Sequence, residues 1–351
     1  MMGQITIKDI AKLAGVSCAT VSRALNGAPS VDPETRNRVL ALCRQYGYRK
    51  NLLARSLSAS RAGLIGCILS DLNNPLFSEM ALLLEQSARR RGCHVLLCHG
   101  RVEDTDIEQV FDFLIGHRVD GIILVSSSRQ APALIRRYMG RVPILLQGSL
   151  APDACPEAPI PSVAVDNLAG GRLAAEYLYG LGHRHVAYLG LRSNNQSLIL
   201  RHQGFAETAL QLGMTVRTLS NDTTASNTAV GYQLARQFFF EDLRETAIFA
   251  ACDTVALGVM AAAGEFHVSI PGELSLLGFD NISYAALPNI RLSTLTHQSA
   301  QVVEAAVRQL LAQVNHTEPL DGAPLLVTPA LVKRASCREL QPCASSSQPN
   351  L

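Results

Sequence analysis

The chain has 351 residues, of which 48% are hydrophobic and 17% are charged, and these proportions exclude an intrinsically disordered protein. No uninterrupted apolar run approaches the roughly 18 residues that a membrane-spanning helix requires. The first fifteen residues contain Lys8, Asp9 and Lys12 where a signal peptide has its apolar core, so we expect a cytoplasmic protein. The nine cysteines include no Cys-x-x-Cys pair, which argues against a zinc or disulfide framework.

The net charge of +2 is divided unevenly along the chain. Residues 1–61 contain ten Lys/Arg and three Asp/Glu, which gives +7, whereas the remaining 290 residues carry a net charge of −5. A small basic segment joined to a larger, mildly acidic one is typical of a nucleic-acid-binding module fused to a second function.

Three short helices are predicted in the basic segment. The first starts with a capping box between Thr6 and Asp9 and ends at Gly15, Ser17 caps the second, and Asp32 caps the third. The apolar faces expected to form its core are Ile10, Leu13 and Ala14, then Val21, Ala24 and Leu25, then Val39, Leu42, Cys43 and Tyr46. Two helices joined by a turn that contains Gly, with a third as support, indicate a helix-turn-helix. The alternative is an ordinary three-helix bundle whose basic residues only keep it soluble.

The run from Ile7 to Asn26 contains D-I-A-x-x-A-G-V-S-x-x-T-V-S-R-x-L-N and resembles the headpiece of the lactose/galactose repressor family. The resemblance implies that Cys18 and Ala19 occupy the two positions that select the operator. It also implies a hinge helix that follows Lys50, where the family usually has Pro. The DNA-binding residues expected from the resemblance and the helix faces are Thr6, Ser17, Cys18, Ala19, Thr20, Ser22, Arg23, Asn26, Thr35, Lys50, Asn51, Ala54 and Leu57.

The chemistry of the second helix agrees with those roles. Hydroxyl groups and a helix N-terminus suit phosphates, which fix register without carrying sequence information. Arg23 is the one exposed side chain expected on this helix that can contact guanine in a bidentate manner. Cys18 and Ala19 offer small, weakly polar surfaces, such as one that fits a thymine methyl group.

Beyond residue 61, apolar runs alternate with helical patterns, which predicts an α/β protein with buried parallel strands. The predicted strands are Gly63–Leu69, Val95–Cys98, Gly121–Val125, Ile144–Leu146, Val186–Gly190, Val216–Leu219, Ile248–Cys252 and Leu274–Gly278. The second four repeat the first four at an offset of 121, which aligns Ile65 with Val186 and Val95 with Val216. Two such lobes of parallel sheet flanked by helices resemble the periplasmic-binding-protein-like core of the same family.

Polar residues near the predicted strand ends indicate a ligand cleft between the lobes. The expected effector-binding residues are Asn73, Phe77, Ser127, Arg201, Asp253, Asp280 and Gln298, of which Arg201 and Asp280 match effector positions of the family. Asp253 and Asp280 could instead cap turns or helices, and Phe77 could pack in the core. The chain has no Trp and few aromatic residues, so a sugar-like effector is favoured by the family and not by the residues.

Catalytic motifs are absent from the sequence: there is no G-x-S-x-G elbow, no phosphate-binding loop and no H-E-x-x-H. His183 and His185 have no carboxylate or Cys at ligand spacing, so we expect them on a loop surface. The sequence therefore predicts a protein that is not an enzyme and has no metal or cofactor.

The predicted domains are a headpiece at 1–50, a hinge at 51–61, a two-lobed core at 62–334 and a disordered tail at 335–351. The first lobe is expected at 62–163 and 296–324, and the second at 164–295 and 325–334. The function predicted is an effector-controlled transcriptional regulator, of the repressor type, that binds palindromic operator DNA as a homodimer. The alternatives are an activator of the same family, and a small-molecule-binding protein or diverged enzyme with a non-regulatory headpiece.

Overall fold

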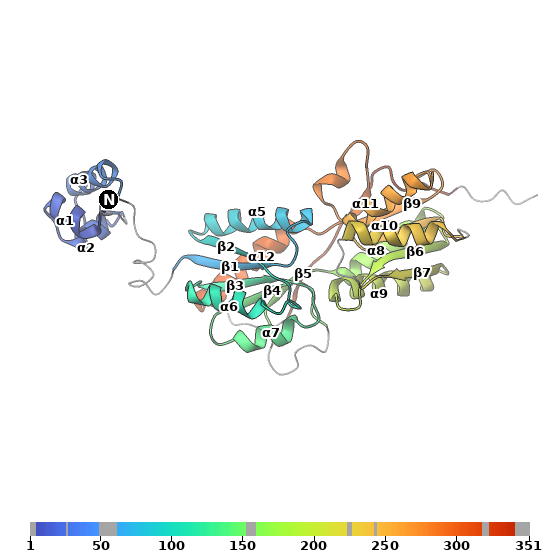
Figure 1. Ribbon diagram of the computed structural model, residues 1–351, viewed down its shortest axis with the longest axis horizontal. Helices are drawn as coiled ribbons and strands as arrows, with labels where there is room; N and C mark the ends of the chain where they lie inside the picture. Colours follow the sequence, from blue (N-terminus) through green and yellow to red (C-terminus); the bar gives the residue numbers. More distant parts are fainter. Residues whose placement is uncertain are drawn as a thin grey trace, which may run out of the picture. The chain divides into compact units, whose positions relative to one another are not determined.

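The structure is a computed structural model that describes residues 5–25, 27–48, 62–151, 159–222, 227–241, 244–317 and 323–340. The chain divides into two compact units, residues 1–62 and 63–351 (Figure 1). No helix within the described residues is long and apolar enough to cross a membrane.

The first unit contains three helices, α1 (Ile7–Ala14), α2 (Cys18–Leu25) and α3 (Pro33–Gln45). The predicted caps are confirmed: Thr6 and Asp9 form a reciprocal capping box, and the Asp32 carboxylate accepts two backbone N–H groups at the start of α3. Its core is formed by Ile10, Val21 and Val39, which are fully buried, together with Ala11, Ala14, Ala24, Val31 and Cys43.

The prediction that Leu13 and Tyr46 belong to the core of this unit is wrong. Leu13 is 48% exposed and Tyr46 is 45% exposed, and Ala11 takes the place of Leu13 against the other helices. Three helices of 8, 8 and 13 residues bury only a narrow stripe, and small side chains allow their backbones to approach closely.

The first lobe of the second unit is a parallel six-stranded sheet in the order β11-β5-β4-β3-β1-β2. Helices α5 and α12 pack on one face, and α6 and α7 pack on the other. The elements are β1 (Leu64–Leu69), α5 (Pro75–Arg90), β2 (His94–His99), α6 (Ile107–Gly116), β3 (Gly121–Val125), α7 (Ala131–Tyr138), β4 (Ile144–Gln147), β5 (Ser162–Val165), α12 (Ser299–Asn315) and β11 (Leu325–Val327).

The second lobe is a six-stranded sheet in the order β12-β10-β9-β8-β6-β7, in which only β12 is antiparallel to its neighbour. Helices α10 and α11 cover one face, and α8 and α9 cover the other. The elements are α8 (Asn167–Gly180), β6 (His185–Leu191), α9 (Gln196–Gln211), β7 (Thr215–Ser220), α10 (Asn227–Phe239), β8 (Ala247–Ala250), α11 (Asp253–Glu265), β9 (Ser275–Asp280), the 3₁₀ helix η1 (Ser283–Ala286), β10 (Ser293–Thr296) and β12 (Leu331–Val332).

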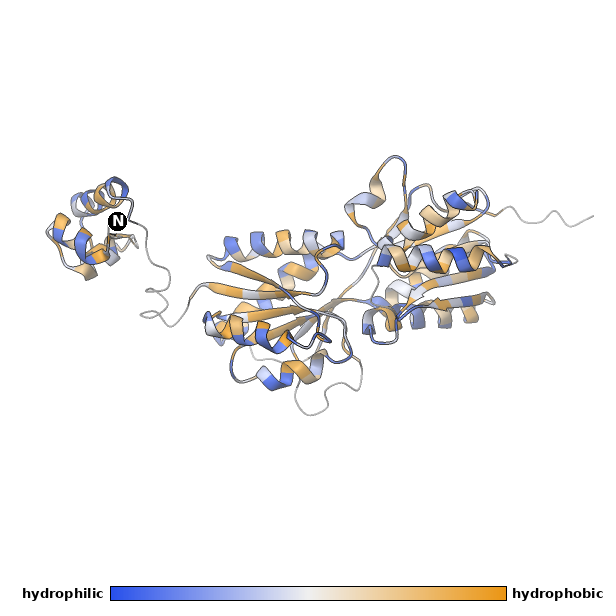
Figure 2. Cartoon of the chain, viewed as in Figure 1, coloured by the Kyte–Doolittle hydropathy of each residue, from blue (hydrophilic) through white to orange (hydrophobic). Residues whose placement is uncertain are grey.

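The two lobes repeat one layout, as the internal alignment predicted. In the first lobe Ile65 pairs with Val95, and in the second lobe the aligned residues Val186 and Val216 also pair. Figure 2 shows apolar strands between helices whose outer faces are hydrophilic. The chain passes between the lobes after β5, after β10 and again between β11 and β12 (Figure 1).

Several predicted boundaries need correction. Residues 325–334 do not all belong to the second lobe, because β11 pairs with β5 of the first lobe. Strands β2 and β7 are not buried, because each lies at a sheet edge and leaves most of its residues partly or fully exposed. The predicted disordered tail begins too early: residues 335–340 lie on the second lobe, where the Ser336 carbonyl accepts the N–H of Leu276 at 2.7 Å.

Candidate functional site

The exposed face of α2 carries the residues that the sequence assigned to DNA. Ser17 caps this helix, since its Oγ accepts the N–H of Thr20 at 3.1 Å and lies 2.9 Å from the Thr20 hydroxyl. Cys18, Ala19 and Arg23 are exposed, and Ser22 is half-buried. Val21 and Ala24 hold the opposite face of the helix in the core. The helix therefore presents a small-residue surface with one arginine beside it.

The basic residues around α2 are not neutralised by carboxylates. Within the described part of this unit, no Lys or Arg lies within 4.0 Å of an Asp or Glu oxygen. Arg23 donates from Nε only to the carbonyl of Ala19 at 3.3 Å, so the rest of its guanidinium is free for a base or phosphate. Unpaired cations on a small exposed unit are what phosphate binding requires.

Two other predicted DNA residues lie at helix starts. Thr6 is exposed and occupied in the α1 capping box, and Thr35 is half-buried in the first turn of α3. The predicted contacts Asn26, Lys50, Asn51, Ala54 and Leu57 lie outside the described residues.

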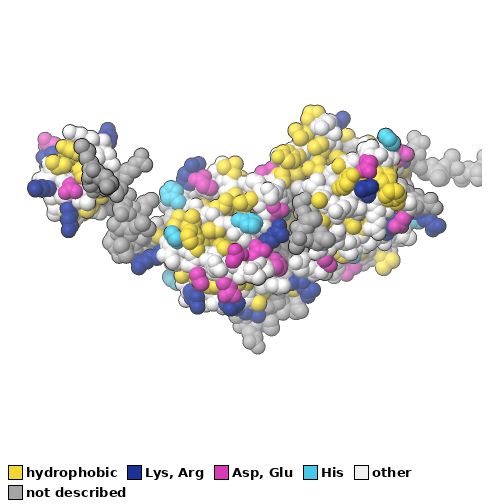
Figure 3. Space-filling model, viewed as in Figure 1, with side chains coloured by type: hydrophobic (Ala, Val, Ile, Leu, Met, Phe, Trp, Pro, Cys, Tyr) yellow, Lys and Arg dark blue, Asp and Glu magenta, His cyan; other side chains and the backbone are white. Residues whose placement is uncertain are grey.

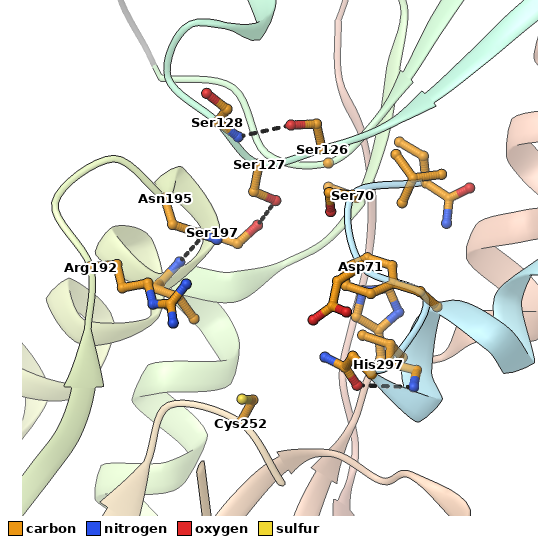
Figure 4. A pocket seen from close by; sticks show the side chains of 18 of the residues that line it. Ser70, Asp71, Ser126, Ser127, Ser128, Arg192, Asn195, Ser197, Cys252 and His297 are labelled. Atoms are coloured by element: carbon orange, nitrogen blue, oxygen red, sulfur yellow. Dashed lines mark hydrogen bonds between the residues drawn. The ribbon is translucent and has the colours of Figure 1, made fainter. Parts of the chain in front are cut away.

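A cavity of about 410 Å³ lies between the two lobes of the second unit, at the carboxyl ends of their strands. Polar loops from both lobes line it: Ser70 and Asp71 follow β1, Ser126 to Ser128 follow β3, and Asn194 and Asn195 follow β6 (Figure 4). A cavity of this size, with a few converging polar groups, is typical of a small-molecule site.

Four of the seven predicted effector residues line this cavity, namely Phe77, Ser127, Arg201 and Asp280. The other three are not part of its wall. Asn73 is exposed and only donates its backbone N–H to Asp71, and Gln298 is the left-handed N-cap of α12. Phe77 also packs against the core, as the alternative interpretation of this residue expected.

Asp253 is a structural residue, which corrects its assignment to the effector. It is fully buried, and its carboxylate accepts the Thr294 hydroxyl at 2.6 Å and the Ile282 N–H at 2.9 Å. Gly278 leaves room for it, because a Cβ there would lie 2.1 Å from Asp253 Oδ1. Burial raises the pKa of this carboxyl well above its ordinary range, and nearby Asp280 raises it further. Asp253 therefore holds the loop that follows β9.

Arg201 is 3% exposed and is fixed from several sides. Asn167 Oδ1 accepts Nε at 3.1 Å and Nη2 at 2.7 Å, and the Ala251 carbonyl accepts Nη1. The guanidinium also lies 3.4 Å from the centroid of the Phe279 ring. Within the described residues no carboxylate oxygen lies within 4.0 Å of it, so this buried cation has hydrogen bonds but no ion pair.

Asp280 is 7% exposed and ends β9 at the cavity. Its backbone has φ 111°, in the region that favours glycine, which marks a constrained turn at a position that lines the cavity. Burial raises the pKa of this carboxyl to about 7, an effect that Arg201 opposes and Glu79 strengthens. Asp280 can therefore accept a proton, or a hydrogen bond from a ligand, near neutral pH.

The structure adds cavity residues that the sequence analysis did not name. Among them, Asn167 orients Arg201, and Ser197 joins the lobes through its hydroxyl, 2.6 Å from Ser127 Oγ (Figure 4). Burial and the nearby Arg201 lower the pKa of His297 to about 4, so its ring is neutral at pH 7. The further polar and charged lining residues are Ser70, Asp71, Asn74, Arg101, Glu103, Asp104, Ser126, Ser128, Gln147, Asn167, Arg192, Asn194, Asn195, Ser197, Asp222, Asn227 and His297.

Backbone contacts also join the lobes beside the cavity. Ser128 and Asn195 form an isolated β-bridge, and the Arg129 N–H donates to the Asn194 carbonyl at 3.0 Å. On another side of the cleft, Glu79 accepts the N–H of Ser283 at 3.1 Å. A ligand that moves the lobes must change these contacts.

The sequence predicted that His183 lies on a loop surface, and this prediction is wrong. His183 is fully buried and its Nδ1 lies 2.7 Å from the Thr246 hydroxyl. His185 is exposed as predicted, but it is the first residue of strand β6 and not part of a loop. Burial lowers the pKa of His183 to about 4. Among the described residues no group of three or more His, Cys, Asp or Glu side chains could hold a metal ion.

Comparison with known proteins identifies both units. Residues 6–51 match the model of bacterial regulatory proteins of the lacI family, and residues 175–337 match a periplasmic-binding-protein-like domain. Over 344 residues the chain is 29% identical to the HTH-type transcriptional repressor PurR of Glaesserella parasuis serovar 5 (strain SH0165), covering 95% of this chain and 99% of that protein. It is 28% identical to the ribose operon repressor of Escherichia coli (strain K12), covering 94% and 99% of the two chains.

Solved structures give the same result. The lac repressor dimer bound to operator and the anti-inducer ONPF matches with a TM-score of 0.83 and 26% identity, covering 95% of this chain and 99% of that one. A complex of the transcriptional regulator CelR with cellobiose matches with a TM-score of 0.70 and 26% identity, at the same coverage. The fold and site are those of a DNA-binding transcriptional regulator. The chain combines a helix-turn-helix domain of the lacI family with a periplasmic-binding-protein-like domain.

Proposed function

We propose that the protein is a repressor that binds a pseudo-palindromic operator as a homodimer and is controlled by a small polyhydroxylated effector in the interlobe cleft. One observation carries the proposal. The same chain contains a helix-turn-helix whose described Lys and Arg side chains form no ion pair, and a polar cavity between two lobes. Two relatives, PurR and the ribose operon repressor, are named as repressors.

The proposed DNA contacts follow from the exposed face of α2. Arg23 reads guanine in the major groove, Cys18 and Ala19 select neighbouring bases by size, and the hydroxyls of Ser17 and Thr20 contact phosphates. Ser22 extends this surface, and Thr6 and Thr35 add contacts to the DNA backbone. Asn26 and Lys50 enter the proposal on sequence alone. Asn51, Ala54 and Leu57 enter the proposal on sequence alone, as a hinge that inserts Leu57 into the minor groove.

The effector class is supported by the chemistry of the cavity wall. Ten of its twenty polar or charged lining side chains are serines and asparagines, which exchange hydrogen bonds with ligand hydroxyls in either direction. Among the described residues, the cavity wall has one phenylalanine, Phe77, and no other aromatic ring apart from the His297 imidazole, so this wall offers little surface for stacking a planar nucleobase. Two relatives support a sugar-like ligand by their names, the ribose operon repressor and the CelR complex with cellobiose.

A homodimer is supported by exposed apolar side chains on both lobes (Figure 3). Leu82 of α5 is 59% exposed and Leu97 of the edge strand β2 is 43% exposed. Tyr284 and Leu287, at η1 of the second lobe, are 50% and 44% exposed. Where such exposed apolar side chains gather into a contiguous patch, the patch is typical of a protein interface. Two-fold pairing would also present two headpieces to two half-sites.

The test starts from the DNA. Duplexes that bind the full-length protein are selected from a random pool, and the selected sequence is then used as an anisotropy probe with D-ribose, D-xylulose and cellobiose. The proposal expects a two-fold symmetric site, one dimer per site in sedimentation, and release by at least one polyol. An asymmetric site bound by a monomer would contradict the dimer, and release by nucleobases alone would contradict the polyol effector.

A further inference from the structure

The end of strand β4 places an amide where the pattern of the sheet calls for an apolar side chain. Side chains alternate between the two faces of a strand, so Gln147 shares a face with Leu145, which is fully buried against the core that contains α5 and α12. On the neighbouring strands, Gln147 lies opposite Val125 of β3 and Val163 of β5. A glutamine at this point therefore has no polar neighbour within the sheet.

The Gln147 side chain is held in one orientation. Its Nε2 donates to the sulfur of Met80 at 3.8 Å, and because a thioether can only accept, this contact directs the NH₂ group to Met80 and leaves Oε1 on the other side. The next residue, Gly148, fixes the strand end, because a Cβ there would lie 1.8 Å from the Ser126 carbonyl oxygen.

The remaining oxygen has no partner. Gln147 is 3% exposed, and its Oε1 is buried without a hydrogen bond from any described residue. A buried acceptor left unpaired is costly, and such groups in a folded protein call for an explanation. Gln147 lines the interlobe cavity together with Phe77, Val302 and Asp280, so a molecule in that cavity lies beside this side chain.

We infer that Gln147 is a specificity-determining residue of the cleft, whose Oε1 accepts a hydrogen bond from a hydroxyl or N–H group of the effector. This inference rests on the proposed function of the cavity. Gln147 belongs to the first lobe and Asp280 to the second, so an effector that donates to both contacts one acceptor on each lobe. Ligands that lack the donor facing Gln147 leave this oxygen unpaired and are rejected.

The first arm of the test uses the effector-free, full-length protein and requires no ligand. Gln147→Met removes the amide and keeps an unbranched side chain of similar length, and Leu145→Met on the same face is the packing control. The inference expects the melting temperature of Gln147→Met to stay unchanged or to rise by about 2–4 °C, because an unpaired buried acceptor has been removed. A fall larger than that of Leu145→Met would show that Gln147 has a structural role and would overturn the inference.

The second arm uses D-ribose, D-xylulose and cellobiose as probes in isothermal titration. For a probe that binds the wild-type protein, Gln147→Met is expected to weaken binding by about tenfold, whereas Leu145→Met has little effect. Mono-deoxy analogues of that probe identify the donor: one of them should bind both proteins equally weakly. Equal binding of every intact probe to wild type and Gln147→Met would overturn the inference. If no probe binds the wild-type protein, the polyol part of the proposed function fails, and the melting temperatures still decide the role of Gln147.

Discussion

Removal of the Arg201 side chain should separate ligand control from DNA binding. In Arg201→Ala, the acceptors Asn167 Oδ1 and the Ala251 carbonyl lose their donors, and the Phe279 ring loses the cation that lies 3.4 Å from its centroid. Each buried acceptor left unpaired costs about 1–3 kcal/mol. Water from the adjoining cavity relieves part of this cost, so we expect a loss of about 2 kcal/mol in the free energy of unfolding. That loss corresponds to a fall in melting temperature of roughly 4–8 °C.

The assay compares operator binding with and without the polyol that releases the wild-type protein. Arg201→Ala should bind the operator with nearly wild-type affinity and should no longer be released, because a ligand shifts an equilibrium only through differential binding. Arg184→Ala is the matched control: this arginine also belongs to the second lobe and lies 3.9 Å from the centroid of an aromatic ring, that of Tyr179, but it does not line the cavity. Release of Arg201→Ala at the wild-type polyol concentration would refute the assignment of the cleft.

Three further predictions concern the headpiece and the cavity. Arg23→Ala should weaken binding to the selected operator by about 1–3 kcal/mol, with discrimination lost at one guanine per half-site in competition assays; equal losses on all sequences would mean that Arg23 contacts phosphate. The logarithm of the operator association constant should fall with the logarithm of salt concentration by roughly 0.9 per neutralised phosphate; a flat dependence would exclude the headpiece as the DNA-binding unit. The pKa of Asp280 is raised from 3.8 to about 7, so the folded protein holds the proton of this carboxyl group more tightly than the unfolded chain does. The contribution of Asp280 to the free energy of unfolding therefore falls as pH rises from about 4 to about 7. The difference in unfolding free energy between wild type and Asp280→Asn should change over this range and be constant above it; the difference isolates Asp280 from His297, whose lowered pKa acts in the opposite sense.

The sequence predicted eight of the twelve strands in the two described sheets, including the edge strands β2 and β7. It missed the short edge strands β11 and β12 and also the interior strands β5 and β10 beside them. Continuous apolar runs such as Gly121–Val125 are buried on both faces and leave a clear pattern. Strands β11 and β12 contain three and two residues, and their position depends on pairing with β5 and β10, distant in sequence, so no local pattern marks them. The same long-range pairing explains why β11 belongs to the first lobe.

The site was predictable to the level of strand ends and not to the level of side-chain direction. Asp253 and Asp280 both lie at strand carboxyl ends, but one is turned into the protein by Thr294 and Ile282 and the other lines the cavity. Serine contacts across the cleft, such as Ser127 with Ser197, join residues 70 positions apart and carry no local signal. Gln147 could have been found from the sequence, because an amide ends the apolar run that starts at Ile144.

Effector binding in the cleft and operator binding by the headpiece are proposed to be coupled, and thermodynamic reciprocity tests this coupling. The dissociation constant of the releasing polyol is measured by isothermal titration with the free protein and with the protein saturated by its operator. If the polyol weakens operator binding by some factor, the operator must weaken polyol binding by the same factor, which we expect to be at least about fivefold. Equal polyol dissociation constants in the two titrations would contradict this coupling, because the cleft and the headpiece would then bind their ligands independently.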